Sequence, residues 1–151
     1  MGWGVEAAER IRRRQSNQEE FEELEAQSRR LLEERGSILW SLVCEAVADF
    51  ACDLNRVYGS TLIRPKARGS VRLDLEFEYG ERLTGVKIEF EPTTSHAALR
   101  WEYCGYLGKG VKHGSCHLYI RGSGEAAFRR GLQFLRPVDL AEEILNGLIA
   151  E

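Results

Sequence analysis

The chain has 151 residues, a length typical of one domain, and carries a net charge of −3 with 43% hydrophobic and 30% charged residues. With only three prolines and this hydrophobic fraction, the composition excludes a largely disordered chain. No apolar run approaches the roughly 18 residues of a membrane span, and no signal-peptide pattern opens the chain, so we expect a cytoplasmic protein without a membrane partner.

The spacing of apolar residues predicts one long, polar helix over residues 5–35. Apolar side chains are sparse there, and Phe21, Leu24 and Leu31 fit part of a heptad stripe. A helix with so little apolar surface either lies loosely on the domain, as a solvated helix with one apolar edge, or pairs with a copy of itself. We expect Phe21, Leu24 and Leu31 to be the candidate interface.

A second helix is predicted over residues 38–58, where apolar residues follow i, i+3, i+4 spacing. Gly36 is expected to end the first helix and Ser37 to cap the second. The resulting division is an extension or dimerisation arm over residues 1–35 and a single α+β domain over residues 36–151.

Period-2 alternation predicts a first hairpin from residues 71–79 and 84–91, joined by residues 80–83. Matching the inward faces of its strands places Phe77 opposite Val86. These strands each have one face toward the core and one toward water.

A second hairpin is predicted from strands over about 98–106 and about 112–121. Its inward faces match when Trp101 lies opposite Leu118. In that register Cys116 faces inward.

The remaining segments complete an α+β fold. Residues 60–68 are a possible strand, and only at the edge of the sheet, because Pro65 has no backbone N–H to donate to a neighbouring strand. Residues 125–134 are expected as a short helix or turn. Pro137 begins a last helix. We therefore expect two N-terminal helices, a four-stranded (possibly five-stranded) antiparallel β-meander and a C-terminal helix, with the helices packed on one face of the sheet.

The four cysteines show no C-x-x-C spacing and are expected to be reduced thiols. Two cysteines and two histidines lie within fourteen residues, namely Cys104, His113, Cys116 and His117. The expected register sends the two thiols of this group to opposite faces, and the spacing matches no standard zinc pattern. We expect no metal site, no cofactor and no assignable catalytic residue.

One face of the second hairpin gathers polar side chains into a candidate ligand site. The residues are Arg100, Glu102, His117, Tyr119 and Arg121. The expected register sets Glu102 opposite His117. The arrangement indicates either a small-molecule site or a solvated sheet face with cross-strand charge pairs.

Basic residues are frequent in the C-terminal half, where Tyr119 offers a surface on which a base can stack. Against a nucleic-acid partner stand the pI of about 5.7 and an acidic row on the first hairpin that would repel phosphate. That row comprises Asp74, Glu76, Glu78, Glu89 and Glu91. Nucleic-acid binding is therefore unlikely in this interpretation.

These patterns favour a non-enzymatic interaction or adaptor protein, chaperone-like in character, that self-associates through its helices as a homodimer or binds a protein partner. The alternative is a small-molecule binding protein or enzyme with a polar site on the second hairpin. A further alternative is nucleic-acid binding through the basic C-terminal half.

Overall fold

The computed structural model describes residues 2–92, 97–105 and 112–149. The chain divides into two units, residues 1–31 and 32–151. Helix α1 (Trp3–Tyr58) is one uninterrupted helix that supplies residues to both units. In the first unit it is the sole described element, and none of its side chains there is buried.

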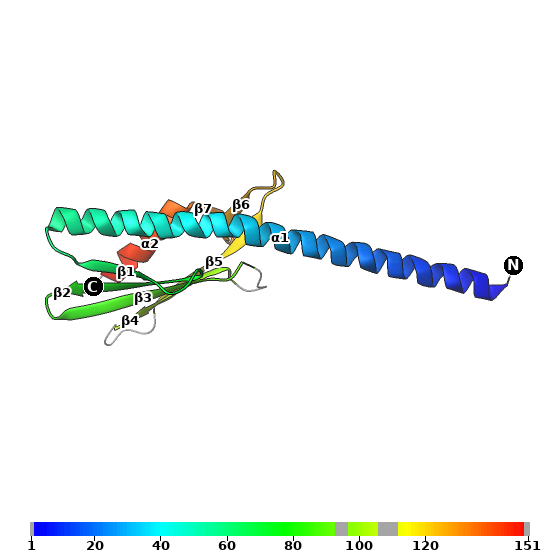
Figure 1. Ribbon diagram of the computed structural model, residues 1–151, viewed down its shortest axis with the longest axis horizontal. Helices are drawn as coiled ribbons and strands as arrows, with labels where there is room; N and C mark the ends of the chain where they lie inside the picture. The colour runs from blue at the N-terminus through cyan, green and yellow to red at the C-terminus, as the bar shows by residue number, and fades with distance from the viewer. Residues whose placement is uncertain (1, 93–96, 106–111, 150–151) are drawn as a thin grey trace. The chain divides into compact units, whose positions relative to one another are not determined.

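The second unit contains a seven-stranded antiparallel sheet in the order β1-β2-β3-β4-β5-β6-β7, so each strand pairs with the next along the chain (Figure 1). The α+β class is confirmed, whereas the expected four or five strands were too few. The elements after α1 are β1 (Ile63–Ala67), β2 (Arg72–Tyr79), β3 (Arg82–Phe90), β4 (Leu99–Cys104), β5 (His113–Ile120), β6 (Ala126–Arg130), β7 (Gln133–Leu135) and α2 (Pro137–Ile149).

Three segments beyond the four expected strands, β1, β6 and β7, form strands because each pairs with a neighbouring strand through backbone hydrogen bonds. Strand β1 is an edge strand, where Pro65 is tolerated. The side chain of Asn55, near the end of α1, accepts hydrogen bonds from the backbone of Leu62 and Ile63 at 2.8 and 3.0 Å. Residues 125–134, expected as a helix or turn, form β6 and β7, because pairing with β5 outweighs their weak helical pattern.

The prediction of two N-terminal helices is wrong, and Gly36 explains why. Gly36 is buried inside α1, and a Cβ built there would lie 2.7 Å from Leu118 Cδ2 and 3.0 Å from Phe90 Cζ. The glycine therefore permits close approach of the helix to the sheet and does not end the helix. Ser37 is not a cap either, since its hydroxyl donates to the carbonyl of Glu33 at 2.6 Å.

The first hairpin is shifted by two residues from the expected register. A two-residue turn at Gly80-Glu81, with a φ of 61° at Gly80, places Phe77 opposite Thr84. The even shift leaves every side chain on its expected face. It also pairs Asp74 with Lys87, which is electrostatically favourable.

The second hairpin is shifted by four residues, so that Trp101 lies opposite Gly114 in place of Leu118. A Cβ at Gly114 would overlap the indole ring of Trp101, so the ring occupies the space that the glycine leaves. A larger residue opposite Trp101 has no such room. The expectation that Cys116 faces inward and Cys104 outward is confirmed, because Cys116 is buried and Cys104 is exposed.

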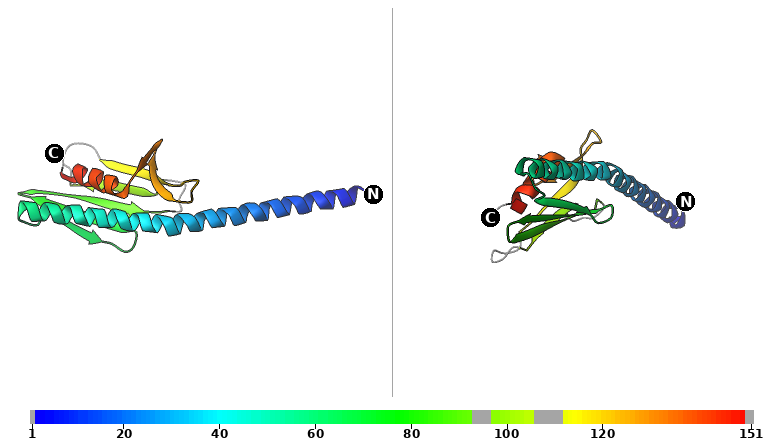
Figure 2. Two further views of the ribbon diagram at one scale, coloured as in Figure 1. Left: turned by 90° about the horizontal axis from the view of Figure 1, so that it is seen from above. Right: turned by 60° about the vertical axis from the view of Figure 1, so that its left-hand side comes forward.

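Helix α2 and residues 32–58 of α1 lie on the same side of strands β1–β4 and share one hydrophobic core with them (Figure 2). Trp40 of α1 stacks on Phe90 of β3 with ring centroids 5.5 Å apart and donates its indole N–H to the Ser70 carbonyl at 2.7 Å. The opposite side of the sheet, called the outer face below, is left to polar side chains.

Replacing Gly114 by alanine is expected to lower the free energy of unfolding by about 1–3 kcal/mol, because the new methyl group displaces the Trp101 ring. Urea denaturation measures the effect. The matched control is Gly122→Ala, since no atom lies within 4 Å of the Cβ added there. Equal denaturation midpoints for the two variants would contradict the role assigned to Gly114.

Candidate functional site

Charged side chains alternate in sign along rows that cross the outer face. In the longest row, successive strands contribute Lys66, Asp74, Lys87, Glu102 and His113. A second row contains Arg72, Glu89, Arg100 and Ser115. Cross-strand pairs of opposite charge stabilise a sheet and neutralise its surface.

Cations on and beside β1, together with Arg72 and Arg100, pair with the acidic row that was expected to repel phosphate. The ion pairs of this face include Arg64–Glu78 at 4.0 Å, Lys66–Glu76 at 3.9 Å, Arg68–Asp74 at 3.3 Å, Arg72–Asp74 at 3.0 Å and Arg100–Glu91 at 3.1 Å. Each exposed pair adds little stability. Together they leave no uncompensated acidic residue on β2.

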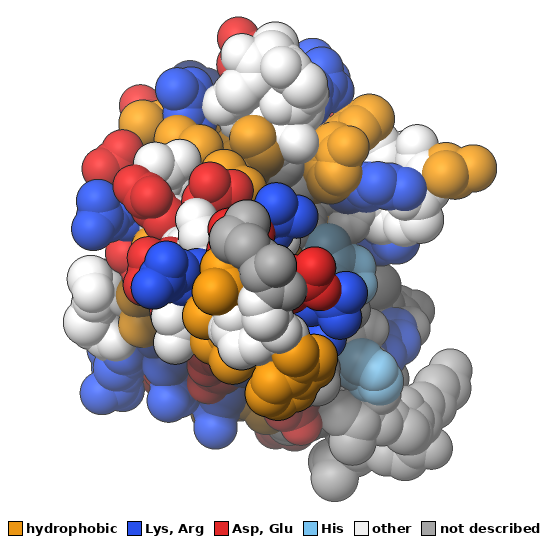
Figure 3. Space-filling view, turned by 90° about the vertical axis from the view of Figure 1, so that its right-hand side faces the viewer, with side chains coloured by type: hydrophobic (Ala, Val, Ile, Leu, Met, Phe, Trp, Pro, Cys, Tyr) orange, Lys and Arg blue, Asp and Glu red, His pale blue; other side chains and the backbone are white. Residues whose placement is uncertain are grey.

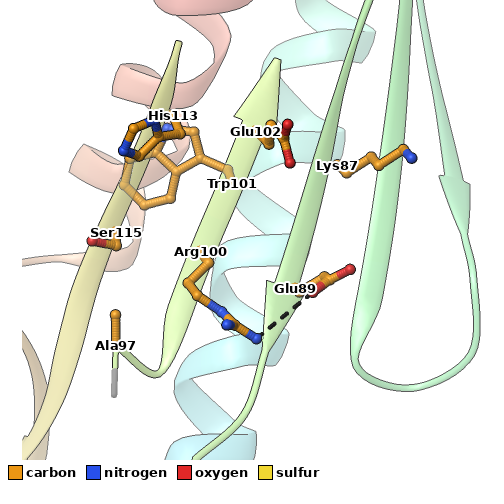
Figure 4. A pocket seen from close by; sticks show the side chains of 9 residues that line it. Lys87, Glu89, Ala97, Arg100, Trp101, Glu102, His113 and Ser115 are labelled. Carbon is orange, nitrogen blue, oxygen red and sulfur yellow. Dashed lines mark ion pairs between the residues drawn. The ribbon is translucent and has the colours of Figure 1, made fainter. Parts of the chain in front are cut away.

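A concavity of about 700 Å³ lies on the outer face over β3, β4 and β5 (Figure 4). Two of the sequence-predicted ligand residues, Arg100 and Glu102, line it. Lys87, His113 and Ser115 join them. His113 and Ser115 were missed because the expected register of the second hairpin was wrong, and Lys87 was missed because no pairing between the two hairpins was predicted. Arg100 also lies 3.8 Å from Glu89, across the strand pair.

The chemistry available in this concavity is that of an open polar surface. Its charged side chains point away from the helices in Figure 4, and those of Lys87, Arg100 and Glu102 are exposed. The concavity therefore provides charged hydrogen-bonding groups for a ligand but supports no catalytic assignment.

The other three predicted ligand residues lie on a different part of the sheet, the ribbon β5–β7. His117 lies opposite Arg129, and Tyr119 opposite Ala127. The structure thus separates His117, Tyr119 and Arg121 from Arg100 and Glu102, and the expected Glu102–His117 pair is wrong: Glu102 faces His113.

Tyr119 and Arg121 belong to a group with Arg129 and Phe134, which we call the aromatic–arginine cluster. The rings of Tyr119 and Phe134 lie 6.0 Å apart, centroid to centroid. The guanidinium of Arg121 lies 4.3 Å from the Phe134 centroid, and that of Arg129 lies 5.2 Å from the Tyr119 centroid. Figure 3 shows one face of the molecule, on which hydrophobic and basic side chains lie next to one another. Arg129 and Phe134 were missed because their segment was expected to be helical.

On the helix side of the sheet, Arg130 binds Glu143 of α2 through two hydrogen bonds of 2.8 and 2.7 Å. The Arg130 guanidinium lies 5.8 Å from the Trp101 ring centroid. Beside it, the Tyr103 hydroxyl donates to the Ile144 carbonyl at 2.7 Å, and burial raises the pKa of Tyr103 to about 12. These contacts fasten α2 to the sheet.

The hydrogen bonds from Arg130 lower the pKa of the Glu143 carboxyl. The pair therefore stabilises the fold above the ordinary carboxyl pKa of about 4.3, and this stabilisation is lost as the pH falls through the lowered pKa. Glu143→Gln is expected to reduce the free energy of unfolding at pH 7 by about 1 kcal/mol, a small value because both side chains are partly exposed.

Urea denaturation of wild type and Glu143→Gln at several pH values tests this dependence. The difference between them should shrink as the pH falls below the ordinary carboxyl pKa of about 4.3 and through the lowered pKa of Glu143. Glu142→Gln, on the neighbouring exposed residue, should behave as wild type throughout. A pH-independent difference would contradict an ionic role for Glu143.

The cysteines differ in environment. Cys116 is buried, and desolvation raises its pKa to about 12, while burial raises the pKa of the half-buried Cys44 to about 11. Cys52 and Cys104 are exposed. Within the described residues, no group of three or more His, Cys, Asp or Glu side chains is arranged to hold a metal ion.

Thiol titration of the native protein is expected to show fast reaction of Cys52 and Cys104 and no reaction of Cys116 before unfolding, because the thiolate is the reactive form. Cys104→Ser should remove one fast equivalent. Reaction of Cys116 at the rate of Cys104 would contradict its placement in the core.

In the first unit, the candidate interface residues Phe21 and Leu24 are 61% and 62% exposed, and Leu31 is also exposed. Trp3 is 82% exposed. No ion pair forms within residues 3–31, so the i,i+4 pairs that the sequence allows, such as Glu25–Arg29, are not made.

Comparison with family models, with curated proteins and with solved structures finds no match for this chain. Among the described residues, no helix combines the length and apolar character that crossing a membrane requires.

Proposed function

We propose that the protein is a non-enzymatic interaction protein that self-associates through residues 3–31 of α1. The observation that carries the proposal is that this helical segment exposes Phe21 and Leu24 and buries no side chain of its own. Isolated helices are marginally stable in water, and most gain their stability from packing. A partner helix supplies that packing.

The charge pattern of the segment selects the partner. Residues 10–14 hold four arginines and no acid, while residues 19–25 hold five glutamates and no base. Like charges four apart, such as Arg10 with Arg14 and Glu19 with Glu23, destabilise a helix. Neither block is neutralised by an ion pair within the segment.

A second copy of the same segment neutralises both blocks when it runs antiparallel. Residues 10–14 of one copy then face residues 19–25 of the other, twice in each pair of helices. A parallel pair places like blocks side by side and adds repulsion. Charge complementarity of this kind sets orientation in paired helices.

The expected affinity is modest. Burying Phe21 and Leu24 in both copies contributes about 6–12 kcal/mol before costs, at about 1.5–3 kcal/mol for each side chain. Association costs about 4–15 kcal/mol. A dimer with a dissociation constant in the micromolar range or weaker follows, with charge pairing deciding its orientation.

Analytical ultracentrifugation of the full chain tests self-association. We expect concentration-dependent dimerisation that the double variant Phe21→Ser, Leu24→Ser abolishes, because it removes the buried apolar surface. The matched control is Val5→Ser, an exposed apolar residue on another face of the helix, which should leave the dimer intact. A monomer at all concentrations would refute the proposal.

Charge exchange tests the orientation. Replacing the arginines of residues 10–14 by glutamate makes both blocks acidic and should abolish the dimer, and additionally replacing the glutamates of residues 19–25 by arginine should restore it. Circular dichroism verifies helicity in each variant. In a parallel dimer, replacing the arginines by glutamate exchanges repulsion between two arginine blocks for repulsion between two glutamate blocks. If this variant dimerises as wild type does, the antiparallel arrangement is contradicted.

A further inference from the structure

The aromatic–arginine cluster presents two rings to solvent on the ribbon β5–β7. Tyr119 is 42% exposed and Phe134 is 44% exposed. Large aromatic side chains on the wet face of a sheet leave apolar surface in water, and Tyr and Arg are enriched where proteins bind partners. At the tip of the β6–β7 hairpin, Leu132 is 91% exposed and adds further apolar surface in water.

The two arginines of the cluster lack carboxylate partners in the part of the chain that the structure describes, whereas most arginines of the sheet have one. Arg64, Arg68, Arg72 and Arg100 pair with acids of the outer face, and Arg130 pairs with Glu143. Arg121 and Arg129 lie over aromatic rings instead. The cluster therefore concentrates uncompensated positive charge beside exposed rings.

The acidic row of the first hairpin, which opposes a polyanionic partner, is paired with cations. Arg64 and Lys66 of β1 pair with Glu78 and Glu76. Arg68, which follows β1, pairs with Asp74, and Arg100 pairs with Glu89 and Glu91, so each acid of the row has a cationic partner.

We propose that the aromatic–arginine cluster binds single-stranded nucleic acid, independently of self-association through α1. Bases stack on Phe134 and Tyr119, and Arg121 and Arg129 contact the phosphates. Only unpaired bases present a free face to such rings, so a duplex is not the ligand. Stacking on aromatic rings is tolerant of sequence, so we expect little preference among bases.

Two phosphate contacts give binding that is weak and shallowly salt-dependent. For a single strand, the slope of log affinity against log salt is about −0.7 for each contact, so two contacts predict about −1.4. The contributions of the arginines and of the rings can be separated by measuring affinity at several salt concentrations. Loss of the arginines flattens the slope, whereas loss of a ring lowers affinity at every salt concentration.

Fluorescence anisotropy of a fluorescein-labelled ten-nucleotide oligothymidylate, titrated with the full chain at low salt, tests the proposal. Phe134→Leu keeps an apolar residue but removes the ring, and should weaken binding about tenfold. The double variant Arg121→Gln, Arg129→Gln should weaken binding similarly and bring the salt slope close to zero. The matched control is Arg64→Gln with Arg68→Gln, on and directly after β1, which removes equal charge elsewhere and should retain the wild-type slope.

Urea denaturation shows whether Phe134→Leu is folded. If it is not folded, the salt slope measured with the double variant Arg121→Gln, Arg129→Gln tests the proposal by itself. Binding that persists in the monomeric variant Phe21→Ser, Leu24→Ser supports an independent site. No binding at low salt, equal binding to a duplex, or affinity and slope unchanged in both cluster variants would overturn the proposal. Phe134-dependent sedimentation with anionic phosphatidylserine vesicles, without oligonucleotide binding, would overturn it in favour of a lipid surface.

Discussion

The indole of Trp101 lies over Gly114, and much of the C-terminal half follows from that contact. A ring of this size needs an opposing position without a side chain, which sets the register between β4 and β5. The same register brings His113 opposite Glu102 and carries His117 onward to pair with Arg129 of β6. One steric requirement therefore divides the polar residues of the second hairpin between two surfaces.

The helix side of the sheet depends on the same region. Arg130 lies against the Trp101 ring and binds Glu143, so the strand pair β4–β5, the ribbon and α2 meet at one place. Gly147 of α2 leaves room there for the Tyr103 hydroxyl, which a Cβ would overlap. Gly114 thus leaves room for the ring of Trp101, and Gly147 leaves room for the ring of Tyr103. Both aromatic side chains lie where α2 meets the sheet.

Charge compensation separates the structural surfaces from the candidate binding surfaces. On the outer face of β1–β4, acids and bases alternate and pair, which is what a stable solvated sheet requires. The segment of residues 10–25 and the aromatic–arginine cluster differ, because their charged side chains form no ion pair among the described residues. Uncompensated charge beside exposed apolar side chains motivates both proposals, one for a second copy and one for a polyanion.

The sequence by itself determined the α+β class and, for most strand residues, the face on which each side chain lies. Alternation specifies faces directly, and both hairpins were shifted by even numbers of residues, which preserves faces. For this reason Leu99 and Trp101 are buried as expected, while Arg100 and Glu102 are exposed.

Only the tertiary structure decided the registers, because turn geometry and the space beside Trp101 depend on three-dimensional contacts. It likewise decided that Gly36 continues a helix against Phe90 and that β6 and β7 are strands, since the partners that override local preference are distant in sequence. The composition of the candidate sites followed from those registers. The sequence therefore named only part of each site, Arg100 and Glu102 of the concavity and Tyr119 and Arg121 of the cluster, and grouped these residues together.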